Sequence, residues 1–130
     1  MLAQFTSLCS EQGINIENLT NKGSLAEVFV ANELVKNSSC YEPPQLFCWH
    51  REKKDSQAEV DFVVQKGYDI IPIEVKAGTR GSMQSLRIFM QEKHSAYGVR
   101  TSQENFAQYD NIKVYPLYAI SNLIRQWKES

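Results

Sequence analysis

The sequence lacks any long hydrophobic run. None of its apolar segments approaches the roughly 20 residues that a bilayer-spanning helix needs, so we expect no membrane partner. The start of the chain has no basic stretch followed by an apolar one, so no secretory signal is expected. Cysteine is scarce, and Cys9, Cys40 and Cys48 form neither a CxxC motif nor a Cys/His cluster. We therefore expect a cytoplasmic protein with reduced thiols and no structural zinc.

A strong charge of either sign is also missing. The 130 residues include 14 Lys and Arg against 15 Asp and Glu, which gives a formal net charge of −1. Without a global basic excess, binding to nucleic acid has to be argued from a local site. No linker divides the chain, so we expect one domain at 22–130. A helical segment is expected before it, at 1–21, where Leu2, Phe5 and Leu8 have helical spacing.

The hydrophobic pattern alternates between a helical period and a period of two. The predicted helices cover 22–36, 82–94 and 119–128, and the predicted strands cover 45–51, 58–64, 69–75, 97–101 and 112–117. The first three strands follow one another with short connections, as in an antiparallel meander. This order predicts the α/β class, with a central mixed sheet and helices on both faces.

Two neighbouring strands each combine an apolar face with an acidic one. Alternation along 58–64 places Val60, Phe62 and Val64 on one face and Glu59 and Asp61 on the other. If this strand pairs with the next one in the expected register, the acidic groups of both strands converge.

The strand at 69–75 repeats the arrangement. Ile71, Ile73 and Val75 share one face, whereas Glu74 and the following Lys76 belong to the other. Glu74 and Lys76 are two residues apart and therefore reach the same side of the sheet.

A third carboxylate, Glu27, lies in the helical segment LAEVFVA between residues that favour burial. Because a buried carboxylate needs a cation, a metal or a hydrogen bond, Glu27 is a candidate for the same patch. Three carboxylates and a lysine suit phosphodiester hydrolysis, since Mg²⁺ prefers oxygen ligands and lysine can neutralise charge at phosphorus. The simpler alternative is solvated carboxylates, with Lys76 paired to Glu74 or Asp61 and Glu27 reaching solvent or Lys22.

Asp61, followed by Glu74-Val75-Lys76 and preceded by Glu27 on a helix, resembles the PD-(D/E)xK nuclease superfamily, which has the restriction-endonuclease-like fold. The segments KGSLAEVFVANEL, LFCWHR, AEVDFVV and IIPIEVKAG resemble the domain of unknown function at the C-terminus of prokaryotic AAA-type ATPases. This resemblance covers about residues 20 to 120. Val60 stands where the superfamily's name has proline. No Walker A sequence occurs, so we expect no ATP site in this chain. Compared with this family, the chain is expected to be either a truncated relative or the C-terminal part of a longer protein.

The resemblance implies a role for each matching residue. Asp61, Glu74 and the backbone carbonyl of Val75 would hold Mg²⁺ or Mn²⁺, and Lys76 would be the catalytic lysine. Glu27 would be a supporting ligand or a group that orients water.

Basic residues near these strands are candidates for contact with a phosphate backbone. They are Arg51, Lys53, Lys54, Arg80 and Arg87. Solvated charges at a hairpin tip are the alternative.

Two functions follow as expectations. The first is a metal-dependent nuclease acting on phosphodiester bonds, with DNA as the substrate. The second is a catalytically inactive module that docks nucleic acid or protein, as the C-terminal domain of an ATPase-family protein. A homodimer or an ATPase-family partner is compatible with either function.

Overall fold

The computed structural model describes residues 22–38, 40–41, 43, 46–55, 57–78 and 81–129, so the segment predicted at 1–21 lies outside the described residues. The helices are α2 (Lys22–Lys36), α3 (Gln84–Lys93) and α4 (Ile120–Glu129), and the short 3₁₀ helix η2 (Leu117–Ala119) leads directly into α4. The strands are β1 (Phe47–His50), β2 (Glu59–Lys66), β3 (Asp69–Val75), β4 (Gly98–Ser102), β5 (Ala107–Tyr109) and β6 (Ile112–Pro116). The predicted helices are therefore confirmed to within two residues at each end.

All six strands form one sheet in the order β1-β2-β3-β4-β6-β5. The first three strands pair antiparallel, as predicted for a meander, whereas β3–β4 and β4–β6 pair parallel. The short strand β5 was not predicted, and it pairs antiparallel with β6 at the edge. The predicted α/β class with a mixed sheet is confirmed.

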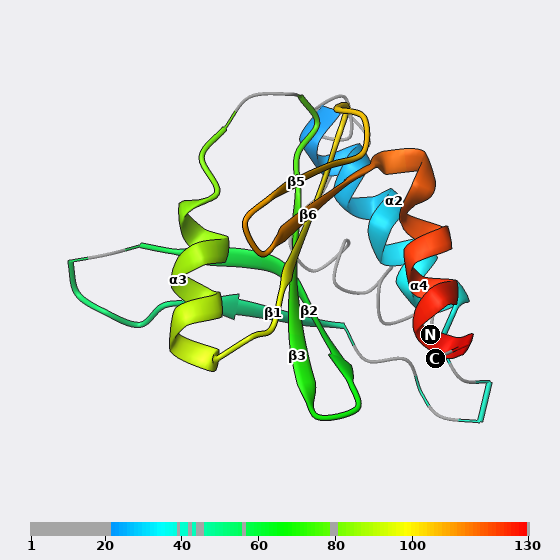
Figure 1. Cartoon of the computed structure of the whole chain (residues 1–130), viewed down its shortest axis with the longest axis horizontal. Helices are drawn as coiled ribbons and strands as arrows, with labels where there is room; N and C mark the ends of the chain where they lie inside the picture. Colours follow the sequence, from blue (N-terminus) through cyan, green and yellow to red (C-terminus); the bar gives the residue numbers. More distant parts are fainter. Residues whose placement is uncertain are drawn as a thin grey trace.

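Helices cover both faces of the sheet (Figure 1). On one face, α2 and α4 lie side by side, and Val30 and Leu123 pack there with Ile71, Ile73 and Val75. On the other face, α3 packs through Leu86 and Phe89. The predicted apolar face of β3 is therefore confirmed.

The predicted apolar face of β2 needs one correction. Phe62 and Val64 pack on the α2–α4 face as predicted, but Val60 packs with Leu86 under α3. The reason is an irregularity in the β1–β2 ladder, where Phe47 lies opposite Val63 but Trp49 lies opposite Val60. Between these two pairs, β2 advances by three residues while β1 advances by two. The regular alternation of β2 side chains between the two faces of the sheet is therefore interrupted at this point.

None of the helices in the described part of the chain is long and apolar enough to cross a membrane.

Candidate functional site

A polar cleft of about 610 Å³ lies where β1, β2, β3 and the start of α3 approach one another. Its lining includes Arg51, Glu59, Asp61, Glu74, Lys76 and Ser85. The meander brings Asp61 and Glu74 together because β2 and β3 are adjacent and antiparallel. Convergence of the acidic groups and Lys76 was predicted from the alternation, and the structure brings them to one cleft.

Asp61 is tied to the neighbouring strand through its side chain. The described pairing of β2 with β3 ends at Phe62 opposite Ile73. Beyond it, the Val75 N–H donates a hydrogen bond to Asp61 Oδ2 at 2.8 Å. Burial raises the pKa of Asp61, and the Val75 hydrogen bond and the Lys76 charge oppose this increase. The Asp61 carboxylate is thus fixed in place, but the hydrogen bond and the Lys76 charge offset only part of the unfavourable effect of its burial.

Glu74 is the most buried acidic residue of the cleft, with 5% of its surface exposed. Its Oε1 lies 3.7 Å from Lys76 Nζ, whereas Oε2 is buried without a hydrogen-bond partner. Burial raises the pKa of Glu74, and the positive charges of Lys76 and Arg100 act in the opposite direction. The ion pair that we gave as the simpler alternative for Lys76 is therefore present, but it satisfies only one of the two carboxylate oxygens.

Glu27 approaches the cleft from the other layer of the molecule. It is exposed on α2, the helix that covers the opposite face of the sheet. Its pKa is raised by desolvation first and then by the negative charges of Asp61 and Glu59, while Lys76 lowers it. Glu27 is thus within electrostatic reach of the cleft without lining it.

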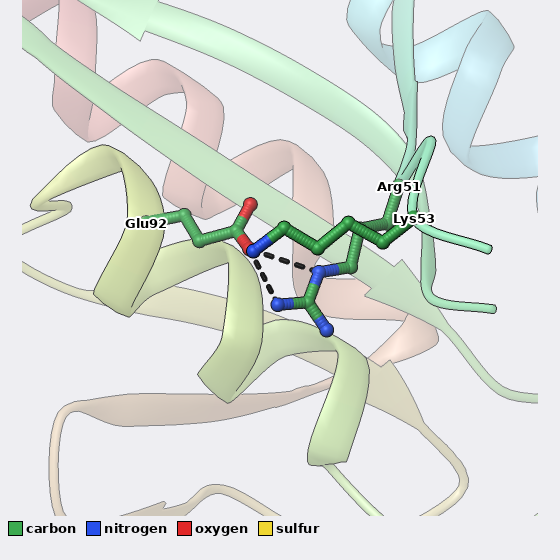
Figure 2. A network of polar contacts seen from close by, with 3 residues as sticks. All are labelled: Arg51, Lys53 and Glu92. Carbon is green, nitrogen blue, oxygen red and sulfur yellow. Dashed lines mark hydrogen bonds and ion pairs between the residues drawn. The ribbon is translucent and has the colours of Figure 1, made fainter. Parts of the chain in front are cut away.

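Arg51 and Lys53 share one carboxylate partner at the rim. Arg51 Nη2 and Nε lie 2.8 Å and 2.9 Å from Glu92 Oε1, and Lys53 Nζ lies 3.9 Å from the same atom. Figure 2 shows both side chains reaching from the β1–β2 connection to Glu92 on α3. Arg51 and Lys53, which were both predicted to contact phosphate, are thus held together beside the cleft by Glu92.

The structure does not place the other residues predicted to contact phosphate beside Arg51 and Lys53. Arg87 pairs with Asp110 at 3.0 Å and lines a separate hollow between α3 and the start of β6. Lys54 is exposed in the β1–β2 connection and does not line the cleft. Arg80 lies outside the described residues.

Sequence reasoning did not single out Arg100 or His50. Arg100 is 1% exposed on β4 and lies opposite Glu74 in the parallel ladder. The available signal for Arg100 was its charge, because it stands in the segment GVRTS, which was predicted to be a strand of the sheet. His50 lines the cleft, and its Nδ1 lies 3.3 Å from Glu59 Oε2.

The donor set fits a hard divalent cation in part. Asp61 and Glu74 provide carboxylate oxygens, and the partnerless Glu74 Oε2 is the atom with the clearest need for a ligand. Mg²⁺ is commonly held by one or two carboxylates with water and phosphate oxygens. Within the described residues, no group of three or more His, Cys, Asp or Glu side chains is placed to hold a metal ion.

One comparison with known proteins identifies a family. The family described as "Domain of unknown function (DUF4143)" matches residues 22–120. Neither the curated proteins nor the solved structures contain a match to this sequence. The family match begins with α2 and runs through all six strands to the first residue of α4. Since it spans most of the 130 residues, the chain belongs to the DUF4143 family, an uncharacterised domain family.

Proposed function

We propose that this domain is a metal-dependent nuclease of the PD-(D/E)xK type that hydrolyses phosphodiester bonds in DNA. The observation that carries the proposal is the meeting of Asp61, Glu74 and Lys76 in one polar cleft, with Arg51 at its rim. The order of these residues along the chain and their placement on two adjacent strands both match the superfamily pattern described above.

Residues in and beside the cleft have specific tasks in this proposal. Lys76 places a positive charge where negative charge develops on the phosphate during attack. Arg51 and Lys53 bind the flanking phosphates of the strand. Glu27, which does not line the cleft, contributes its negative charge from the α2 side of the sheet.

Asp61 and Glu74, with the Val75 carbonyl, would hold Mg²⁺ or Mn²⁺. When bound, such an ion polarises the phosphate and lowers the pKa of a coordinated water. The Val75 N–H contributes by fixing the orientation of the Asp61 carboxylate.

The proposal is tested by incubating the protein with plasmid and single-stranded DNA in Mg²⁺ or Mn²⁺. We expect cleavage by the native chain, and a loss of at least about a hundredfold in Asp61→Asn, Glu74→Gln and Lys76→Met. Asp69→Asn is the matched control, because Asp69 is exposed at the other end of β3. Equal cleavage by all variants, or none by the native chain on either substrate, would exclude the nuclease.

The second candidate is an inactive docking module of an ATPase-family protein. It is favoured by the net charge of −1 and by the pairing of Arg51 and Lys53 with Glu92, which weaken independent binding to DNA. Under this proposal, the native chain binds DNA or an ATPase-family partner without metal-dependent cleavage. Both proposals place the domain in the cytoplasm, where Cys40 and Cys48 remain free thiols.

A further inference from the structure

Arg100 is the most buried charged residue in the described part of the chain. Its Nη1 donates a hydrogen bond to the Gly81 carbonyl at 2.8 Å, while Nε and Nη2 are buried without a partner. Arginine keeps its charge even when buried, and a buried cation with unsatisfied donors is unfavourable. The burial of Arg100 with two donor atoms unsatisfied therefore needs a specific explanation.

Gly81 connects Arg100 to the cleft. A Cβ atom added to Gly81 would lie 3.5 Å from Arg100 Nη2 and 3.8 Å and 3.9 Å from Cε and Cδ of Lys76. The Gly81 carbonyl thus contacts the guanidinium group, and the side of Gly81 on which a Cβ would project faces the methylene stem of Lys76. Its φ of +131° is a conformation that residues with a side chain rarely adopt, so glycine is required here.

Lys76 is the third residue of this arrangement, after Arg100 and Gly81. Its backbone N–H donates to the Thr101 carbonyl at 2.8 Å, which fixes where the side chain begins. Its ammonium group ends 3.7 Å from Glu74 Oε1, and the whole side chain is 39% exposed. Between these two ends, the methylene stem lies beside Gly81, at 3.8 Å and 3.9 Å from where a Cβ of residue 81 would stand.

We infer that Arg100 is a positioning residue, which holds the Gly81 backbone beside the Lys76 stem and thereby confines the stem so that the Lys76 ammonium group stays near Glu74. Arg100 stays in the sheet and does not touch substrate. Its importance for catalysis rests on the proposed function, but the contacts from Arg100 through Gly81 to Lys76 do not. A lysine at position 100 would keep the positive charge while losing the planar fork of donors.

The test measures the freedom of the Lys76 amine directly. The native chain, Arg100→Lys and Gly81→Ala are treated with limiting acetic anhydride, and acetylation of each lysine is followed by peptide mass spectrometry. Lys66, at the end of β2, is the internal reference. Thr101→Val is the matched control, because Thr101 is buried next to Arg100 and its Oγ1 has no partner.

We expect the Lys76 rate, relative to that of Lys66, to rise at least about threefold in Arg100→Lys, as for loss of a charge-assisted hydrogen bond. The same rise is expected in Gly81→Ala, because alanine is strained at a φ of +131° and shifts this backbone away from its position. The Thr101→Val ratio should stay at the native value. An unchanged ratio in both test variants, or an equal rise in Thr101→Val, would overturn the inference. The assay needs neither metal nor DNA, so it decides the role of Arg100 even if the native chain cleaves nothing. If the native chain does cleave, Arg100→Lys should lower kcat with little change in KM.

Discussion

Single carboxylates of the cleft lower the stability of the fold when they are ionised. Burial is the largest cause of the raised pKa of both Asp61 and Glu74. A carboxyl group with a higher pKa in the folded chain than in the unfolded chain disfavours folding once it is ionised. Active sites commonly retain such groups, because the same carboxylates are needed to bind charged ligands.

The free energy of unfolding should therefore carry a pH-dependent contribution from Asp61. It is fully favourable below the ordinary pKa of 3.8 and falls as the pH rises from there through the raised folded-state pKa. Above that value both states are ionised and the contribution is constant. We expect Asp61→Asn to gain stability relative to the native chain over this window, as measured by urea unfolding between about pH 3.5 and pH 8. Asp69→Asn serves as the control, and a variant that loses relative stability as the pH rises would contradict the prediction.

At the scale of elements, α3 is the helix that joins the core to the cleft. Leu86 is fully buried against Val60, and the neighbouring Ser85 lines the cleft. Near the other end of the same helix, Glu92 holds Arg51 and Lys53. The packing of α3 therefore sets the position of one wall of the cleft and of its rim.

Leu86→Ala should lower the free energy of unfolding by about 3 kcal/mol, because it removes packed methyl groups and leaves a cavity under α3. The neighbouring variant Arg87→Ala removes only an exposed ion pair with Asp110 and should change stability by less than about 1 kcal/mol. Urea unfolding followed by circular dichroism measures both values. Similar values for the two variants would show that α3 does not contribute to the core as described.

Glu92→Gln should strengthen binding to nucleic acid, because it removes the carboxylate that competes with phosphate for Arg51 and Lys53. A partly exposed ion pair contributes up to about 1 kcal/mol, so we expect a two- to fivefold lower Kd. Fluorescence anisotropy with a duplex oligonucleotide in Ca²⁺ measures the effect. Glu52→Gln makes the same charge change at an exposed site in the β1–β2 connection. If both variants lower the Kd equally, net charge and not the Glu92 contact is responsible.

At the scale of the whole molecule, a bound cation should stabilise the fold by relieving the repulsion between desolvated carboxylates. A ligand present at a hundred times its Kd adds about 2.7 kcal/mol to the free energy of unfolding. We expect Mn²⁺ or Mg²⁺ to raise the Tm of the native chain and of Asp69→Asn. Asp61→Asn and Glu74→Gln should show little increase in a thermal scan. An equal increase in all four proteins would indicate metal binding elsewhere.

Much of this architecture was predictable because its helices and strands have strong hydrophobic periodicity. Placing Asp61, Glu74 and Lys76 in one cleft required only alternation and the adjacency of two strands. Val60 was placed on the wrong face because the irregular β1–β2 ladder leaves no mark in the alternating sequence Glu59-Val60-Asp61-Phe62. The burial of Arg100 depends on the parallel pairing of β3 with β4, which brings together residues 26 positions apart in the sequence, with α3 between them. No local pattern contains that information.

The hydrogen bond from Val75 to Asp61 gives the molecule a natural reporter. A backbone amide that donates to a titratable carboxylate has a proton chemical shift that follows the charge of that carboxylate. The Val75 cross-peak in a ¹H–¹⁵N spectrum should therefore move when Asp61 loses its proton or gains a cation. The charge state of the cleft can thus be followed by NMR at one atom of the main chain, without substrate and without an added label at the site.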